Sequence, residues 1–209
     1  MERADVSELH FMTALVNVPS ILRLGILSHD ASRTVPHSSI ASAAVQERRA
    51  KRTIPGGLRL HQYANLYLSA RNAMMYLVLF NPDVTMRVPS DDLTVLRVRS
   101  EVLEEPGVVI TDINAAADEE PRWHTAGEGL PRLNAGEIFA GSWNHGDFWE
   151  KIRRKQRMMA EVLVPHRVRP EFISGAYVAS DASAVALSAL APTLALEVHP
   201  YMFFRGPRP

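Results

Sequence analysis

The chain has 209 residues, of which 46% are hydrophobic, and its 23 basic and 23 acidic side chains give a formal net charge of zero. A chain of this length and composition can bury the core of a folded domain, so we expect a single domain over residues 1–209. The zero net charge argues against a protein that coats nucleic acid through bulk charge. The absence of cysteine excludes disulfides, zinc-thiolate sites and a cysteine nucleophile.

Nothing in the sequence points to a membrane. No stretch approaches the ~20 consecutive apolar residues of a membrane-spanning helix. The N-terminal sequence MERADVSELH is charged and lacks the apolar core of a signal peptide. We therefore expect a cytoplasmic protein without a membrane partner.

Apolar patterning and turn residues predict alternating strands and helices in the first half of the chain. Asn17 is expected to cap the first helix and Gly25 to end it. The predicted strands are 9–15 and 63–69, and the predicted helices are 17–25, 38–52 and 71–80, with a loop at 28–37.

The second half of the chain contains one long segment without regular patterning, residues 113–146, which we expect to be a loop with short helical pieces. Residues 93–100 alternate and predict a strand with one solvent-exposed face, and Asp181 is expected to cap the last helix. The other predicted strands are 107–112, 160–165, 172–180 and 193–200, and the predicted helices are 148–159 and 181–192. Because strands and helices alternate without a regular βαβ order, the pattern predicts an α/β fold of the mixed α+β type.

The sequence lacks most of the motifs that carry enzyme chemistry. It has no phosphate-binding glycine loop, no dinucleotide fingerprint and no nucleophile elbow. No predicted helix carries two histidines at ligand spacing, so we expect no metal.

One acid, Glu161, stands at the mouth of an apolar strand, and arginine-rich runs occur at 48–59 and 151–157. A carboxylate can stabilise the oxocarbenium character that develops when a glycosidic bond breaks, and arginine favours phosphate. A glycoside hydrolase normally needs a second carboxylate, which we do not find. A substrate with a good leaving group and a pyrophosphate, such as NAD, fits better.

Several segments match one known family in order and spacing. They are FMTALVNVPSILRLG (11–25), QERR (46–49), HQYANLYLSARNAMMY (61–76), ITDINA (110–115) and AEVLVP (160–165). Across nearly its full length the chain resembles the DarT-type bacterial DNA ADP-ribosyltransferase toxins. The resemblance implies an ADP-ribosyltransferase fold, in which a split mixed β-sheet with peripheral helices holds NAD in a central cleft.

The resemblance also implies an activity and partners. The expected reaction transfers ADP-ribose from NAD, the co-substrate, to a base in single-stranded DNA. The expected setting is a toxin–antitoxin or phage-defence system, with a macrodomain antitoxin that removes the ADP-ribose. RNAMMY at 71–76 resembles the branch that modifies guanine, and thymine stays open as the alternative target.

Site residues follow by position in the matched motifs. Glu161 corresponds to the catalytic acid, and Arg49 to the essential arginine that binds NAD phosphate and steadies developing charge. Thr13 corresponds to the threonine that contacts the ribose or nicotinamide. Phe11 stands where the family usually has histidine. His10 is a poor substitute because neighbouring strand residues point to opposite faces.

Further candidates have a structural alternative each. Tyr63 and Tyr67 share one strand face, where they either pack in the core or stack on nicotinamide or a target base. Arg71 contacts the pyrophosphate or is an ordinary surface arginine. Arg154, Lys155 and Trp143 are candidates for binding nucleic acid. The alternative for Arg154 and Lys155 is a solvated helix face, and the alternative for Trp143 is packing in the core.

Three other functions remain open. The chain could be an ADP-ribosyltransferase that acts on RNA or protein, or an NAD glycohydrolase that uses water. It could also be a catalytically silent nucleic-acid-binding module of the same fold, which has lost NAD because of Phe11.

Overall fold

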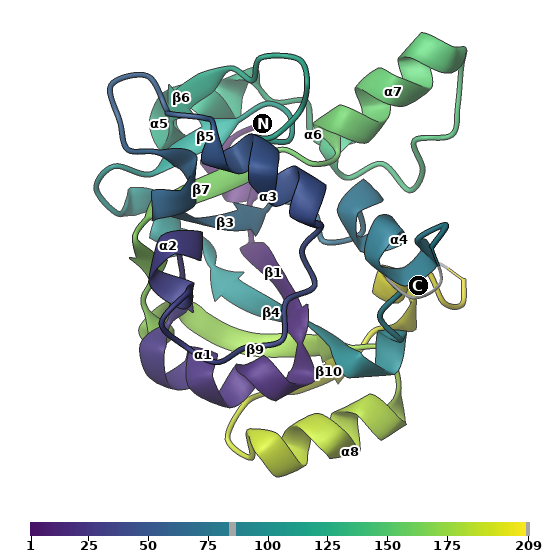
Figure 1. Cartoon of the computed structure of the whole chain (residues 1–209). Coiled ribbons are helices and arrows are strands. Elements are labelled where there is room, and N and C mark those ends of the chain that lie inside the picture. Colours follow the sequence, from purple (N-terminus) through teal and green to yellow (C-terminus); the bar gives the residue numbers. More distant parts are fainter. Residues whose placement is uncertain (84–86, 208–209) are drawn as a thin grey trace.

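The computed structural model describes residues 1–83 and 87–207. Most strands join one eight-stranded sheet, with helices around it (Figure 1). The strands are β1 (Glu8–Ala14), β2 (Ile26–Leu27), β3 (Tyr63–Tyr67), β4 (Leu93–Arg99), β5 (Val109–Thr111), β6 (Trp123–Thr125), β7 (Glu161–Pro165), β8 (Arg167–Val168), β9 (Ile173–Val178) and β10 (Leu196–Val198). The helices are α1 (Val18–Leu24), α2 (His29–Ser32), α3 (Ala43–Ala50), α4 (Ala73–Phe80), α5 (Ala126–Gly129), α6 (Ala135–Ile138), α7 (Phe148–Arg157) and α8 (Asp181–Leu190).

The sheet is mixed and consists of two halves. Its strand order is β10-β9-β4-β1-β3-β7-β5-β6, and β9 and β10 are parallel while the other neighbours are antiparallel. β1 pairs with β4 along its whole length, but with β3 only at His10 opposite Tyr67. The two central strands therefore diverge from a single contact, which gives the split sheet that the resemblance implies.

Strand β4 is buried on both faces, which corrects the prediction of one solvent-exposed side. Leu93 and Val95 pack in one apolar cluster with Phe203, and Leu96 and Val98 pack in another. The alternation of polar and apolar residues suggested that the face of Thr94 was exposed to solvent. Thr94 is instead fully buried, and its hydroxyl donates a hydrogen bond to the carbonyl of Tyr177. A hydrogen-bonded threonine can be buried at little cost.

Two predicted capping side chains and one predicted helix start were wrong, and the predicted loop at 28–37 contains the short helix α2. Asn17 makes no side-chain cap for α1 and instead bonds to other segments. Ser180, rather than Asp181, caps α8 by accepting from Ser183 N. Helix α3 begins at Ala43, five residues later than predicted from the serine-rich start.

The prediction that Gly25 ends α1 is confirmed. Its φ is 88°, a conformation that L side chains rarely adopt, and a Cβ there would lie 2.2 Å from the carbonyl oxygen of Val168. The backbone of β8 thus approaches α1 more closely than any side chain would allow.

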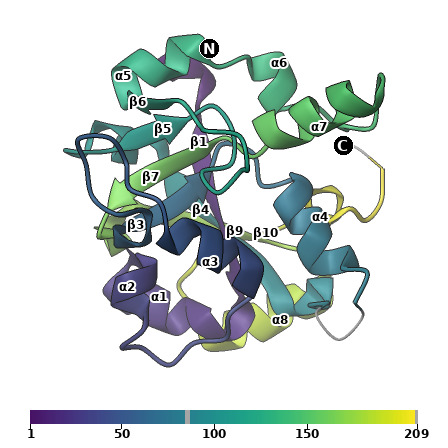
Figure 2. The ribbon, with the colours of Figure 1, turned by 45° about the horizontal axis from the view of Figure 1, so that its top comes forward.

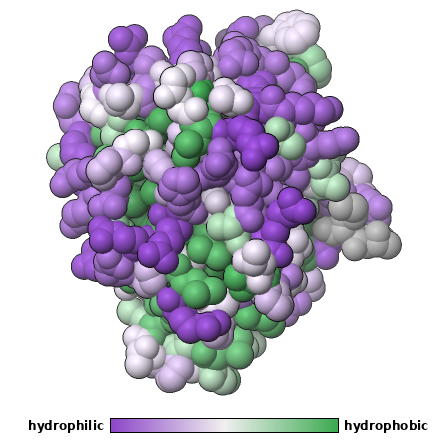
Figure 3. Space-filling view, turned by 60° about the vertical axis from the view of Figure 1, so that its left-hand side comes forward, coloured by the Kyte–Doolittle hydropathy of each residue, from purple (hydrophilic) through white to green (hydrophobic). Residues whose placement is uncertain are grey.

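Residues 113–146 contain the predicted short helices and, in addition, strand β6, which extends the sheet at its edge. Figure 2 shows α5, α6 and α7 together over the upper end of the molecule. Figure 3 views the side of α1 and α2, where apolar residues show in the lower half with polar residues around them. In the described part of the chain, no helix is long and apolar enough to cross a membrane.

Candidate active site

A pocket lies where β1 and β3 diverge. Phe11, Met12 and Thr13 of β1 form one wall, and alternate residues of β3, namely Tyr63, Asn65 and Tyr67, form the facing wall. Helix α3 closes the pocket with Gln46 and Arg49, and α4 contributes Met74. The opening of the sheet thus creates the central cleft that the split topology requires.

Glu161 and Arg49 form a buried ion pair behind this pocket. The Nη1 of Arg49 lies 3.0 Å from one carboxylate oxygen of Glu161 and 3.2 Å from the other. The Glu161 side chain is fully buried, and that of Arg49 is 7% exposed. Arg49 lines the pocket and Glu161 does not, so the arginine is the member of the pair that borders the open space. A buried charge needs such a partner, because removing one ion of a buried pair is strongly destabilising.

Backbone groups complete the surroundings of Glu161. Its Oε1 also accepts a hydrogen bond of 3.1 Å from Ala115 N, in the segment that follows β5. Its own backbone N–H donates to the hydroxyl of Thr111, which in turn donates to the carbonyl of Ile113. The ITDINA segment therefore binds both the backbone N–H and the carboxylate of Glu161, and it fixes the side chain at the first residue of β7.

Tyr67 is directly opposite Glu161 across the β3–β7 pair, so both side chains lie on one face of the sheet. Burial, and then the negative charge of Glu161, raise the pKa of the Tyr67 phenol well above its usual range. The phenol consequently stays protonated and can donate a hydrogen bond inside the pocket.

Thr13 belongs to a hydrogen-bond chain that ties a loop to β1. Asn17 donates through Nδ2 to the Thr13 hydroxyl at 3.0 Å and to the Ser38 carbonyl at 2.8 Å. Its Oδ1 accepts from Ser38 N at 2.8 Å. The loop between α2 and α3 therefore borders the pocket beside Thr13, and Ser38 and Ile40 are among its lining residues.

A histidine pair stands at the α2 side of the pocket. The rings of His29 and His61 are 4.1 Å apart, and His29 lines the pocket. Burial lowers the pKa of both imidazoles, and the proximity of the rings lowers that of His61 further. Gln46 lines the pocket nearby, and its Oε1 is buried without a hydrogen-bond partner in the part of the chain that the structure describes. Such an acceptor is available to a ligand that carries N–H or O–H groups.

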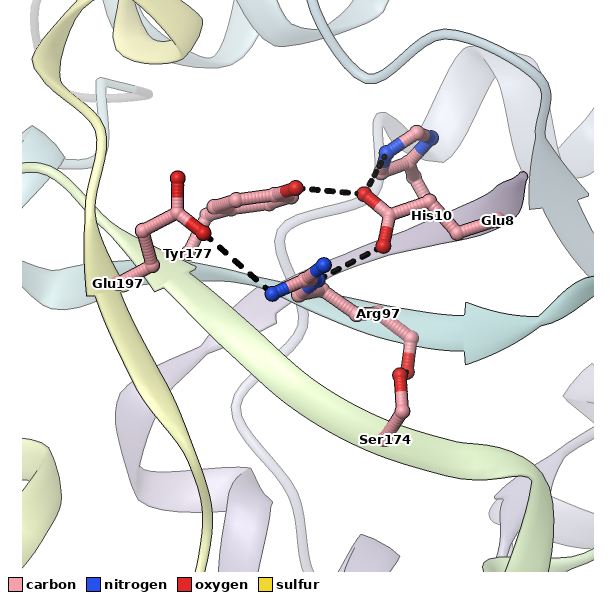
Figure 4. A network of polar contacts seen from close by, with 6 residues as sticks. All are labelled: Glu8, His10, Arg97, Ser174, Tyr177 and Glu197. Carbon is pink, nitrogen blue, oxygen red and sulfur yellow. Dashed lines mark hydrogen bonds and ion pairs between the residues drawn. The ribbon is translucent and has the colours of Figure 1, made fainter.

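The structure separates Phe11 from His10 as the alternation of strand residues predicts. Phe11 lines the pocket, whereas the His10 ring lies 3.3 Å from the Glu8 carboxylate. Figure 4 shows this carboxylate also accepting from Tyr177 OH at 2.6 Å and from Arg97 Nε at 2.7 Å. His10 is thus bound in a cross-strand network and does not replace the imidazole missing at position 11.

Tyr63 and Tyr67 were predicted either to pack in the core or to stack on nicotinamide or a target base. Each is buried and each lines the pocket, so the structure is compatible with both roles. The Tyr63 hydroxyl accepts a hydrogen bond of 3.2 Å from Leu58 N. This bond fixes its ring against the segment that leads into β3.

Arg71 is not among the residues that line the pocket, and its contact with the pyrophosphate stays a prediction. Its guanidinium lies over the rings of Tyr201 and Phe204, 4.2 Å and 4.1 Å from their centroids. Its Nε donates to the Tyr201 carbonyl at 3.0 Å and its Nη1 to that of Gly141 at 2.5 Å. The side chain of Arg71 is therefore held by the rings and the carbonyl of the C-terminal segment and by the carbonyl of Gly141.

The predicted nucleic-acid contacts do not line the pocket either. Trp143 packs edge-on against Tyr76 and Phe204, with centroids 5.6 Å and 6.0 Å away. Arg154 and Lys155 are exposed on α7. No group of three or more potential metal ligands occurs among the residues described.

Sequence reasoning missed several pocket residues: Asn17, His29, Gln46, Asn65 and Met74. A signal existed for Gln46, because it precedes Arg49 by three residues and shares its helix face. Asn17 resembled a helix cap, and nothing in the local pattern linked it to Thr13 and Ser38.

A split mixed sheet with an acidic residue and an arginine at the cleft between its halves defines the ADP-ribosyltransferase class of fold. A solved structure of this class, the Thermosipho africanus DarTG in complex with ADP-ribose, superposes with a TM-score of 0.81 at 26% identity, over 96% of this chain and 52% of that one. The Thermus sp. 2.9 DarT in complex with ADP-ribosylated ssDNA gives 0.79 at 21% identity, over 95% and 96%. The same Thermus protein with NAD+ gives 0.73 at 20%, over 95% and 98%.

The family described as ssDNA thymidine ADP-ribosyltransferase, DarT, matches residues 10–204, and the chain belongs to this family. A curated relative from Thermosipho africanus (strain H17ap60334) is a DNA ADP-ribosyl transferase-DNA ADP-ribosyl glycohydrolase fusion protein. It is 31% identical over 174 residues, which are 82% of this chain. The chain spans only 42% of that relative's length.

Proposed function

We propose that this protein transfers ADP-ribose from NAD to a nucleobase of single-stranded DNA, as a toxin whose modification a macrodomain antitoxin removes. The observation that carries the proposal is the buried Glu161–Arg49 pair beside the pocket between the two halves of the sheet. Membership of the DarT family and the names of the solved relatives support the choice of NAD and single-stranded DNA.

The pocket can hold NAD through several kinds of contact. The guanidinium of Arg49 has N–H donors beyond the one that binds Glu161, and these suit a phosphate or ribose oxygen. Thr13 and Gln46 offer a hydroxyl and an amide to the sugar and the nicotinamide. Phe11 and Tyr67 supply aromatic surface against which a planar ring can pack.

The proposed chemistry breaks the bond between C1′ of the nicotinamide ribose and the nicotinamide nitrogen, and nicotinamide leaves with the bonding electrons. A base nitrogen donates its electron pair to C1′, and its proton passes to a carboxylate or to water. We assign to Glu161 the stabilisation of positive charge on the sugar and the acceptance of that proton. Because the Glu161 side chain is fully buried and paired with Arg49, NAD must displace neighbouring groups to reach the carboxylate.

The target base that we propose is thymine, which the family description names. Guanine, suggested by the RNAMMY sequence, is the alternative. Two oligonucleotides of otherwise constant sequence, one with thymine and one with guanine, would separate these targets. The base whose oligonucleotide gains ADP-ribose is the target.

The setting that we propose is the cytoplasm, where NAD and replicating DNA occur together. The fusion of transferase and glycohydrolase activities named for the Thermosipho relative supports a partner that reverses the modification. Growth arrest on expression, relieved by co-expression of an ADP-ribosyl glycohydrolase macrodomain, is the expected result. Arrest that Glu161→Gln leaves unchanged would contradict the toxin role.

The acceptor can be tested with NAD labelled on the adenine side, offered separately with single-stranded DNA, RNA and protein. We expect label on DNA only, and none with Glu161→Gln. The matched control is Glu101→Ala, which changes an exposed acid remote from the pocket lining. Label on RNA or protein, or nicotinamide release that DNA does not change, would identify one of the other activities.

A further inference from the structure

Helix α7 exposes two large aromatic side chains next to each other. Phe148 is 68% exposed and Trp149 is 65% exposed, more than any other aromatic side chain in the described residues. Their rings are 5.3 Å apart at an interplanar angle of 77°. Leaving this much apolar surface in water forgoes the stabilisation that burial would give, so such a pair marks a place where something binds.

The same helix carries a concentration of positive charge. Lys151, Arg153, Arg154, Lys155 and Arg157 follow the aromatic pair within three turns. Arg157 pairs with Glu137, but Arg153, Arg154 and Lys155 are exposed and form no ion pair with any residue in the described ranges.

The acidic residues at the start of α7 do not offset this charge along the helix. Asp147 accepts from Glu150 N, and the Glu150 carboxylate accepts from Asp147 N, so both acids are engaged in a capping box. Arg153, Arg154 and Lys155 therefore face solvent without an acidic partner among the described residues.

Helix α7 leads directly into β7, the strand that carries Glu161. The helix is anchored at its C-terminal end, where Met158 and Ala160 are fully buried and Glu161 follows directly. Its N-terminal end extends away from the body of the molecule (Figure 1). At a rise of about 1.5 Å per residue, Trp149 lies roughly 14 Å along the helix from Met158. The aromatic pair thus stands at the projecting end of the helix that leads into β7.

We propose that Phe148, Trp149, Arg153, Arg154 and Lys155 form a binding site for the single-stranded DNA that flanks the modified base. The rings stack on unpaired bases and the cations bind the phosphates between them. The inference rests on the proposed function for the identity of the ligand. Stackable rings beside a row of cations are the combination by which proteins bind single strands without reading their sequence.

Charge and residue type favour this ligand over two others. Trp149 and Arg153 are four residues apart on one helix face, so a base and its adjoining phosphate can be contacted together. An anionic membrane would also attract a basic helix with exposed aromatic residues, but an interfacial helix buries an apolar face along its length. On α7 the exposed large apolar side chains are confined to Phe148 and Trp149 at its first turn. A protein partner would favour an apolar centre with fewer charges. Leucine in place of Phe148 or Trp149 keeps an apolar side chain but cannot stack on a base, so this change distinguishes DNA from the other two ligands.

The test measures the affinity of a fluorescent single-stranded oligonucleotide by anisotropy, in a Glu161→Gln background so that no transfer occurs. We expect Trp149→Leu to weaken binding roughly tenfold, Phe148→Leu to do the same, and Trp149→Phe to keep most of the affinity. The triple change Arg153→Ala, Arg154→Ala and Lys155→Ala should reduce the slope of affinity against salt by about two. Val185→Ala on α8, which is 72% exposed, is the control that should change nothing.

Specific outcomes overturn the inference. Oligonucleotide affinity in both leucine variants equal to that of the parent protein would exclude stacking. Binding to phosphatidylglycerol vesicles that the leucine variants retain, without a loss of DNA affinity, would assign the helix to a membrane. If the wild-type protein binds the oligonucleotide through these residues but transfers no ADP-ribose, the proposed function fails and this site stands. Nicotinamide release without DNA should be the same in Trp149→Leu and wild type.

Discussion

Arg49 Nη1 bridges both carboxylate oxygens of Glu161, at 3.0 Å and 3.2 Å, although the two residues are 112 positions apart in the sequence. Arg49 comes from α3 and Glu161 from β7, so the fold itself brings the pair together. The pair serves two purposes that a mutation can separate. It neutralises a buried charge, and it holds the acid beside the pocket.

Replacing Arg49 with alanine should lower both stability and activity. The Glu161 carboxylate would then be buried without its cation, which costs about 3–5 kcal/mol, and the loss of charge stabilisation should reduce kcat/KM by at least about 100-fold. Chemical denaturation and the rate of nicotinamide release measure the two effects. Arg23→Ala, an exposed arginine at the end of α1, is the control.

The double variant Arg49→Ala/Glu161→Gln separates the two roles of the pair. Without a carboxylate there is no uncompensated charge, so we expect much of the lost stability to return while activity stays absent. If the double variant is as unstable as the sum of the single changes, the charge pairing is not what stabilises this site.

Asn17→Ala should release the loop that borders the pocket. The change removes three hydrogen bonds, two to Ser38 and one to Thr13. We expect a loss of about 1–3 kcal/mol in unfolding free energy and a rise of several-fold in KM for NAD, with kcat less affected. Steady-state kinetics against NAD gives the comparison, with Asn144→Ala at an exposed site as control. An unchanged KM would show that the loop does not contribute to NAD binding.

Glu8→Gln should destabilise the protein at neutral pH and not at low pH. Burial alone would raise the pKa of Glu8, but hydrogen bonds from His10, Tyr177 and Arg97 outweigh it and lower the pKa from 4.5 to about 2. A depressed pKa stabilises the fold above the unfolded value, and this contribution is lost as pH falls from about 4.5 to about 2.

Urea denaturation of the wild type and Glu8→Gln at several pH values tests this linkage. The difference should be about 1–3 kcal/mol at pH 7 and should shrink steadily below pH 4.5. A difference that is the same at pH 3 and pH 7 would mean that the network of Figure 4 does not depend on the charge of Glu8.

The order of strands and helices followed from the sequence because apolar periodicity and turn residues report local structure. Strand β6 was missed since its three residues, Trp123–Thr125, give too short a pattern, and it forms only by pairing with β5. Which faces are buried depends on the neighbouring elements. The solvent-exposed face predicted for residues 93–100 failed for this reason, because apolar clusters cover both sides of β4.

The site was predictable only in part. Motif positions gave Glu161, Arg49 and Thr13, yet no local pattern could show that Arg49 would pair with the carboxylate. An arginine also carries no local sign of its partner, so Arg71 could equally have met a phosphate or, as found, the rings of Tyr201 and Phe204. Residue type alone does not show that Trp149 is exposed, which depends on the projection of α7 from the body of the molecule.

The most direct measurement is the mass of a single-stranded oligonucleotide after incubation with NAD and either the wild-type protein or Glu161→Gln. Glutamine keeps the size and one hydrogen-bond acceptor, so the fold and the contact to Ala115 can persist while the charge is lost. We predict that the wild type adds the mass of one ADP-ribose and that Glu161→Gln slows this by at least about 100-fold. Equal addition by both proteins would contradict the assignment of Glu161 as the catalytic acid.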